Sequence, residues 1–145
     1  MKLYLCEKPS QGREIASHIG ARTRGEGCIT GNGVTVTWGI GHLVEQAKPE
    51  HYNPALKFWD IAHLPVVPDE WHMEVKHQTR DQYKIVSKLL KQATEVVIAT
   101  DADREGEVIA RELMQLNGYC GKVSRLWLSA FDDASVKKAL ANILP

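Results

Sequence analysis

Four acidic residues lie close together in the stretch VVIATDADREGEVIARELM, residues 96–114. They are Asp101, Asp103, Glu105 and Glu107, and they separate an apolar segment from a second one with helical spacing. Like charges repel, so such a group is costly unless a cation or solvent compensates. Hard carboxylate oxygens suit Mg²⁺, which usually combines a few carboxylates with water and phosphate oxygens. The pattern therefore predicts magnesium binding by Asp101, Asp103 and Glu105.

A helix that begins within this stretch would favour acidic residues in its first turn, because its N-terminus carries partial positive charge. We interpret Glu107 in this way. The helix dipole accounts less well for Asp101 and Asp103, which lie two residues apart in an extended turn and project to a common side. Arg104 lies inside the group, either as a structural counter-ion or as a ligand for phosphate on DNA.

The segments around the acidic group alternate between strand and helix patterns. Strands are predicted at residues 2–6, 95–99 and 122–128, and helices after Pro9, at 79–92, at 104–117 and after Asp132 or Asp133. This alternation predicts an α/β fold with a mainly parallel sheet covered by helices. In such sheets, sites form at the carboxyl ends of the strands. Glu7 follows the first strand and is therefore expected to face Asp101 and Asp103.

Two regions interrupt the alternation. The segment TGNGVTVTW predicts an inserted hairpin that turns at residues 31–33. Residues 45–70 contain four of the six prolines and are expected to run over the surface. Tryptophan rings can stack on nucleic-acid bases, but we expect core or edge packing for the four in this chain, which are Trp38, Trp59, Trp71 and Trp127.

Composition limits the classes of function. The chain has 145 residues, enough for one domain, and its 18 basic residues balance 18 acidic ones, so DNA binding would need local clusters or another domain. We find no secretory signal and no apolar stretch of membrane-spanning length, so no membrane partner is expected. Three cysteines without CxxC spacing favour reduced thiols and a cytoplasmic location. The six histidines lack the close spacing of a zinc site, so no transition metal is expected.

Short motifs spread along the chain support a more specific interpretation. EKPS follows the first strand, DADREGE follows a later one, and WGIGHLVEQAKPEHY, WDIAHLPVVPDEW and RLWLSAF lie elsewhere. Together they resemble the Toprim domain of type IA DNA topoisomerases, in the topoisomerase III branch. The resemblance covers essentially the whole chain and implies a Rossmann-like Toprim fold over residues 1–145.

The resemblance also implies roles for individual residues. Type IA enzymes cut one DNA strand by the attack of a tyrosine on a phosphodiester, which leaves a 3′ hydroxyl. By resemblance, Glu7 donates a proton to that leaving oxygen, and Lys8 contacts the scissile phosphate. His42, in the GHL motif, would lie near the site as a weaker candidate for DNA contact. The residues that match the family's magnesium ligands are Asp101, Asp103 and Glu105.

The nucleophilic tyrosine of the family lies in a separate domain, and none of the four tyrosines here has that context. We therefore expect a monomeric catalytic module of a topoisomerase III-like isomerase that is inactive alone, with single-stranded DNA and the remaining topoisomerase domains as partners. The alternative is a free-standing Toprim protein that binds a metal or a partner without catalysis. A receiver-like phosphoacceptor is a third interpretation, which EKPS and GHL disfavour.

Overall fold

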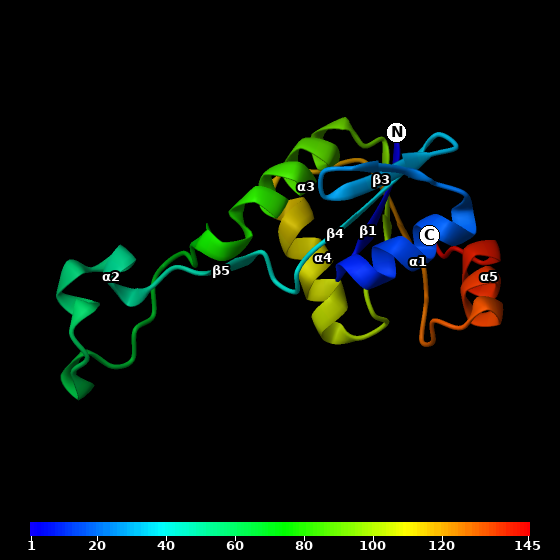
Figure 1. The fold of residues 1–145 in the computed structure, drawn as a ribbon. Helices are drawn as coiled ribbons and strands as arrows, with labels where there is room; N and C mark the ends of the chain where they lie inside the picture. Colours follow the sequence, from blue (N-terminus) through cyan, green and yellow to red (C-terminus); the bar gives the residue numbers. More distant parts are fainter.

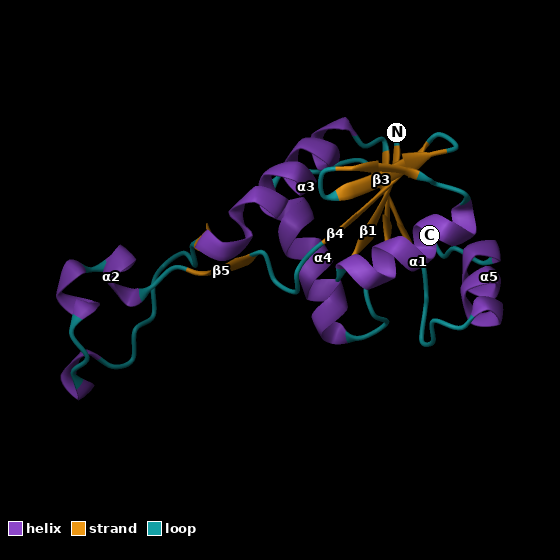
Figure 2. Ribbon diagram, viewed as in Figure 1, coloured by secondary structure: helices purple, strands orange, loops and turns teal.

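The structure is a computed structural model that describes all residues from 1 to 145. A central sheet with helices on both faces forms the body, and a narrow arm extends away from it (Figure 1). We define the arm as residues 48–72. Figure 2 shows the strands of the body gathered between helices, whereas the arm consists mainly of loops and short helical turns.

The main sheet has six strands in the order β2-β3-β4-β1-β7-β8. The strands β1, β4, β7 and β8 run parallel to one another, and β3 is antiparallel to both β2 and β4. This arrangement confirms the predicted α/β fold with a mainly parallel sheet and an inserted hairpin. The strands are β1 (Lys2–Cys6), β2 (Thr23–Gly25), β3 (Cys28–Gly31), β4 (Val34–Trp38), β7 (Glu95–Ile98) and β8 (Lys122–Arg125).

Both faces of the central strands are buried, which explains why their sequences are apolar runs rather than alternating patterns. In β1, Leu3 and Leu5 face one cluster of buried side chains, and Tyr4 and Cys6 face the other. The first cluster includes residues of α3 (Arg80–Gln92) and α4 (Arg104–Leu116), and the second includes residues of α1 (Pro9–Ile19) and α5 (Asp133–Ala141). The sheet is therefore the middle layer of three.

Local sequence signals set the ends of these helices. Proline occupies the first turn of α1, and Gly20 ends that helix with a positive φ of 74°. The Asp132 side chain caps α5 by accepting from the backbone N–H of Ser135 at 3.1 Å, as predicted. Asp103 caps α4 in the same way, and it does so inside the acidic group.

The last strand is shorter than predicted. β8 ends at Arg125, although the apolar pattern continues to Leu128. Its neighbour β7 ends at Ile98, whose carbonyl accepts a final hydrogen bond from the N–H of Leu126 at 2.9 Å. Beyond that point β7 turns towards α4, so no ladder partner remains. Leu126 and Leu128 are nevertheless buried, which accounts for the apolar pattern.

The arm begins and ends at a two-stranded ribbon formed by β5 (Val44–Gln46) and β6 (Met73–Val75). It contains α2 (Pro49–Tyr52) and the 3₁₀ turns η1 (Pro54–Lys57) and η2 (Ile61–His63); a third, η3 (His77–Thr79), precedes α3. No residue from 48 to 78 is buried, in agreement with a surface segment.

The packing prediction for the tryptophans was wrong for three of the four. Trp59, Trp71 and Trp127 are exposed, and only Trp38 packs against the core. Trp59 and Trp71 belong to the arm, where no core is within reach, and Trp127 follows the last strand after its pairing has ended. No helix of the structure has both the length and the apolar character required to cross a membrane.

Candidate active site

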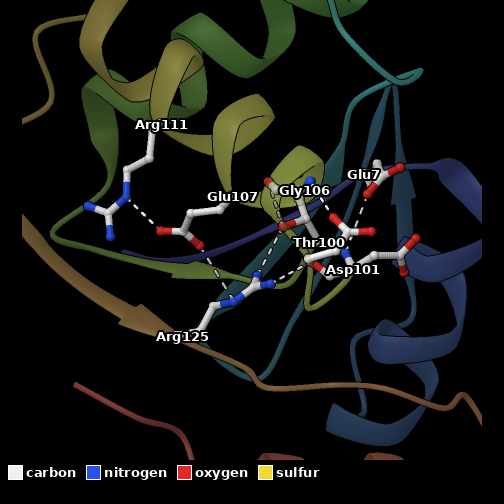
Figure 3. A network of polar contacts seen from close by, with 8 residues as sticks. Glu7, Thr100, Asp101, Gly106, Glu107, Arg111 and Arg125 are labelled. Carbon is white, nitrogen blue, oxygen red and sulfur yellow. Dashed lines mark hydrogen bonds and ion pairs between the residues drawn. The ribbon is translucent and has the colours of Figure 1, made fainter.

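The strand-end site consists of Glu7, Lys8, Asp101, Asp103 and Glu105, and it lies where β1 and β7 end side by side. Leu5 of β1 pairs with Ile98 of β7, so the residues that follow each strand emerge together. The backbone N–H of Asp101 faces the carboxylate of Glu7, with 3.4 Å between the nitrogen and Oε2 (Figure 3). The structure thus brings Glu7 and Asp101 together, as the strand ends predict.

Gln11 joins the two strand ends from α1. Its side-chain amide donates to Oδ1 of Asp101, and its Oε1 accepts from the backbone N–H of Glu7 at 3.0 Å. Gln11 is only 2% exposed, so these bonds are shielded from water. Sequence reasoning missed this residue. The available signal was a glutamine one helical turn before Ile15, on the face of α1 that packs against the sheet.

The environment of Glu7 raises the pKa of its carboxyl group above the ordinary value. Partial burial is the largest cause, and the negative charge of Asp101 comes next. The N–H of Asp101 and the charge of Lys8 act in the opposite direction, and Asp103 adds a smaller increase. Desolvation therefore raises this pKa more than the charges of the neighbouring acids do. A carboxyl group that keeps its proton to higher pH is what general acid catalysis requires.

Asp103 and Glu105 occupy different surroundings from Asp101. Oδ1 of Asp103 accepts from the backbone N–H of Gly106 at 2.7 Å, which makes Asp103 the cap of α4. The Glu105 side chain is 71% exposed, and its Oε1 lies 4.0 Å from Nε2 of His42. No choice of one oxygen from each of the three carboxylates brings all three oxygens within 4.8 Å of one another. As hard oxygen donors they suit a divalent cation, and the second oxygen of Asp103 is not used by the cap.

Cations surround the acidic group unevenly. Nζ of Lys8 lies 3.6 Å from Oδ2 of Asp101, and the lysine side chain is half exposed. Arg111 and Arg125 form ion pairs with Glu107, and Nε2 of the His42 ring lies 4.0 Å from Oε1 of Glu105. Arg104 is exposed and takes part in none of the ion pairs, so the counter-ion interpretation of this residue was wrong.

Arg125, at the end of β8, is the cation that supports the acidic loop. Its Nη1 donates to Oγ1 of Thr100 at 2.9 Å, and its Nη2 donates to the backbone carbonyl of Asp101 at 2.6 Å (Figure 3). Its Nε lies 3.7 Å from Oε2 of Glu107, and the side chain is 12% exposed. Burial lowers the pKa of the guanidinium, against the opposing effect of nearby acids, first Glu107. Sequence reasoning missed Arg125, although it stands out as a charge within the apolar pattern of RLWL.

Glu107 does more than complement the helix dipole. In addition to Arg125, it accepts from Nε of Arg111 at 2.8 Å, one helical turn further along α4. Two arginines therefore hold this carboxylate, and our interpretation from the dipole alone was incomplete.

Gly106 allows α4 to begin directly against the loop. A Cβ atom at this position would lie 2.4 Å from the backbone oxygen of Asp101, closer than atoms can approach. The hydroxyl of Thr100 donates to the carbonyl of Gly106 at 2.8 Å and fixes the same contact. The structure therefore requires glycine at this position for the close approach of α4 to the loop.

The GIGHL segment places His42 beside the acids. The N–H of Gly39 donates to the carbonyl of Cys6 at 2.9 Å, and that of Gly41 donates to the carbonyl of Glu7 at 3.2 Å. The segment therefore follows the end of β1. Nδ1 of His42 lies 3.0 Å from Oε2 of Glu112 on α4, which orients the ring towards Glu105.

A cavity of roughly 390 Å³ adjoins the strand-end site on the side of β8. It combines a free cation, Arg104, with the exposed ring of Trp127. The lining residues are Ala102, Asp103, Arg104, Glu107, Arg125 and Trp127.

Two groups of histidine and carboxylate lie outside the strand-end site. One contains His51, His72 and Glu74, and the other contains Glu14, His18 and Asp133. The expectation that no transition metal is bound came from the lack of close histidine spacing, and the fold shows that such groups can form without it. Folding brings together residues that lie far apart along the chain.

Comparison with known proteins gives a consistent result. A family model described as "Toprim domain" matches residues 2–131. The DNA topoisomerase 3 of Shouchella clausii is 42% identical over 144 residues, which cover 98% of this chain and 20% of that protein. The DNA topoisomerase 3 of Vibrio cholerae is 38% identical over 151 residues, which cover 98% of this chain and 23% of that protein.

A solved structure, that of full-length topoisomerase I from Thermotoga maritima, has a similar fold. It superposes with a TM-score of 0.61 at 20% identity, over 98% of this chain and 21% of that one. The chain thus spans about a fifth of the length of the relatives that it matches.

Proposed function

The chain belongs to the Toprim family, and on that premise we propose that it is the catalytic Toprim module of a topoisomerase III-like enzyme, one that cuts and rejoins single-stranded DNA. The single observation that carries the proposal is the contact between Glu7 and Asp101 at the adjoining ends of β1 and β7. The relatives named DNA topoisomerase 3 support the choice of reaction.

In this proposal Glu7 is the general acid and base of the reaction. A tyrosine from another domain loses its phenolic proton to solvent and attacks the phosphorus. The bond from phosphorus to the 3′ oxygen then breaks, and the proton of Glu7 goes to that oxygen. On rejoining, the carboxylate takes that proton back. The raised pKa supports this role, because a partly buried carboxyl group beside Asp101 holds its proton more readily than an exposed one.

Lys8 contacts the scissile phosphate. Its ammonium group lies 3.6 Å from Asp101, and the half-exposed side chain is free to turn towards an anion that enters the site. A compact positive charge stabilises negative charge that develops on a phosphate oxygen.

Asp101, Asp103 and Glu105 are the residues that would hold Mg²⁺. Carboxylate oxygens are the donors that this ion prefers, and it usually retains several waters. When bound, Mg²⁺ neutralises charge on the carboxylates and on the phosphate. Asp103 would serve with the oxygen that does not cap α4, and Glu105 is exposed enough to adjust its rotamer.

DNA binding by this module depends on local groups and on the remaining topoisomerase domains. The net charge is zero, so the module gains little free energy from counterion release. Arg104 and His42 are the candidate contacts beside the acids, and the cavity next to Arg104 has room for part of a nucleotide. All three cysteines are free, which suits work in the cytoplasm.

A chimeric enzyme tests the proposal. This chain would replace the matching fifth of the Shouchella clausii relative, and the purified chimera would be incubated with negatively supercoiled plasmid and Mg²⁺. We expect relaxation by the chimera and none by the 145 residues alone, because the alignment of nucleophile and phosphate supplies most of the rate. Glu7→Gln in the chimera should abolish relaxation, whereas Glu26→Gln, at an exposed glutamate, should leave it unchanged.

Two results would contradict the proposal. Full activity of the Glu7→Gln chimera would show that Glu7 is not the general acid. Relaxation by the isolated chain would show that one of its own tyrosines is a nucleophile. If the chimera is inactive, amide NMR of the isolated chain during Mg²⁺ titration tests the metal site separately. Shifts that begin at residues 101–106 would support the site, and shifts confined to other residues would refute it.

A further inference from the structure

A second cluster of metal-binding side chains lies where the arm joins the ribbon. It consists of His51 in α2, His72 just before β6, and Glu74 in β6. One ligand atom from each residue lies within 4.8 Å of the other two. Nδ1 of His51 is 3.4 Å from Oε1 of Glu74, and the imidazole rings of His51 and His72 stack with 4.5 Å between their centroids.

The backbone around this cluster is held by contacts that do not involve the three side chains. The N–H of His72 donates to the hydroxyl of Tyr52 at 2.8 Å, and the N–H of Ala47 donates to the carbonyl of His72 at 2.8 Å. Glu74 pairs with Glu45 in the ribbon, and the rings of Tyr52 and Trp71 meet edge to face. These backbone and ring contacts bring both ends of the arm together.

We propose that His51, His72 and Glu74 form a Zn²⁺ site that clamps the base of the arm. Two imidazoles and a carboxylate are a known ligand set for zinc, with water in the fourth position. All three side chains are exposed, so the ring of His72 is free to rotate until a nitrogen meets the ion. Imidazole nitrogens favour Zn²⁺ over Mg²⁺, so this site differs in preference from the oxygen donors of the strand-end site.

The other histidine group does not offer an ion the same access. In that group Nδ1 of His18 faces the backbone carbonyl of Glu14 at 2.9 Å, and Nε2 faces Oδ1 of Asp133 at the same distance. Both ring nitrogens are thus already engaged, and the His18 side chain is 8% exposed. His51 and His72 keep ring nitrogens that no hydrogen bond occupies, and Nδ1 of His51 has only the 3.4 Å contact with Glu74.

A metal ion at this position would hold α2 against the ribbon, which the arm has no buried core to do. No residue between 48 and 78 is buried, so the arm has no core of its own to hold α2 against the ribbon. An ion that ties His51 to Glu74 joins α2 directly to β6. Zinc should therefore slow the opening motions of the arm without changing the body.

The test uses the 145-residue chain and two probes, Zn²⁺ by calorimetry and Co²⁺ by visible absorption. We expect one ion per chain, a change in the imidazole NMR signals of His51 and His72, and slower amide exchange in residues 48–72. His72→Gln and Glu74→Gln should each weaken binding at least about tenfold, since even loss of second-sphere partners costs about that much. His77→Gln, at an exposed histidine outside the cluster, should have no effect.

Two further variants test whether zinc binds to other side chains of the chain instead. Asp101→Asn should leave zinc binding intact, because the strand-end site is independent of it, and Cys120→Ser should do the same for the exposed thiol. Unchanged binding in both His72→Gln and Glu74→Gln would overturn the proposal. So would a signal change confined to His18, or a loss of binding in Cys120→Ser.

Discussion

The body and the arm hold their polar side chains in different ways. At the strand-end site, Glu7 and Asp101 are fixed by partners that water scarcely reaches, among them Gln11, Thr100 and Arg125. In the arm no residue is buried, and large apolar side chains such as Trp59 are 82% exposed. The body therefore depends on its own packing for the geometry of its site, whereas the arm depends on turns, edge contacts and whatever binds to it. Substitutions in the two regions should have correspondingly different effects.

The largest effect is expected for Arg125→Met. The variant leaves the buried hydroxyl of Thr100 and the carbonyl of Asp101 without their donor, which costs about 1–3 kcal/mol per unsatisfied group. The free energy of unfolding, measured by urea denaturation, should fall by about 2–6 kcal/mol, because two groups lose their donor. Arg111→Met is the matched control, since Arg111 is 58% exposed and should change stability by less than about 0.5 kcal/mol. Equal effects of the two variants would show that Arg125 does not support the loop.

A smaller effect, dependent on pH, is expected for His18→Gln. The bond to the carbonyl of Glu14 raises the pKa of His18, burial opposes it, and Asp133 adds to the increase. A raised folded-state pKa stabilises the fold fully below the unfolded value of about 6.5, and this contribution is lost as pH rises through the folded value. The variant should therefore be less stable than the parent below pH of about 6, and the difference should shrink in alkaline solution.

Urea denaturation of both proteins across this pH range measures the effect. His77→Gln serves as the control, because that histidine is exposed and no carboxylate oxygen lies within 4.0 Å of its ring nitrogens. A difference that grows with pH would contradict the assignment of a charged His18 between Glu14 and Asp133.

Glu7→Gln should leave stability unchanged or raise it slightly. Because the folded-state pKa of Glu7 is raised, ionisation costs the folded protein stability as pH rises above the unfolded value of about 4.3. Glutamine removes that cost and keeps an oxygen for the N–H of Asp101. Melting temperatures at neutral and at acidic pH test this, and the gain should vanish in acid. A clear fall at neutral pH would mean that Glu7 is held by an attractive pair.

The smallest effect is expected in the arm. Trp59→Ser removes a large ring that contacts no core, so the free energy of unfolding should change by less than about 0.5 kcal/mol. The same denaturation measurement applies, with Trp38→Ser as a contrasting variant, because Trp38 packs against the core beside Gly12 and its loss should be much more costly. Comparable losses for the two variants would erase the distinction between arm and body.

Features that follow from local patterns, or from a general rule about parallel sheets, were predictable from the sequence. The order of elements followed from apolar patterns, and the meeting of Glu7 with Asp101 followed from a rule about strand ends in parallel sheets. Gln11 and Arg125 were missed because their importance depends on which polar atoms of another segment lie opposite them. No pattern along one strand or helix carries that information.

Long-range proximity also limited the prediction of metal ligands. His51 and His72 meet only because the ribbon returns the chain to its starting point, so their separation in the sequence concealed the cluster. The exposure of Trp59 and Trp71 escaped prediction for a related reason. An apolar residue indicates a core only when enough of the chain surrounds it, and the arm is too thin for that.

The contact between α4 and the acidic loop determines how this segment tolerates change during evolution. An added Cβ at position 106 meets a backbone oxygen, which cannot move aside as a flexible side chain would. Its exposed neighbour Glu105 and the half-exposed Val108 face no such barrier. Consider a library with every amino acid at each position from 104 to 108, selected for a folded domain. Its surviving sequences should all keep glycine at position 106, whereas the other positions should vary. Selection for activity should then restrict the amino acids accepted at the positions on either side of it. Comparison of the two selections would show, residue by residue, which positions folding requires and which the chemistry requires.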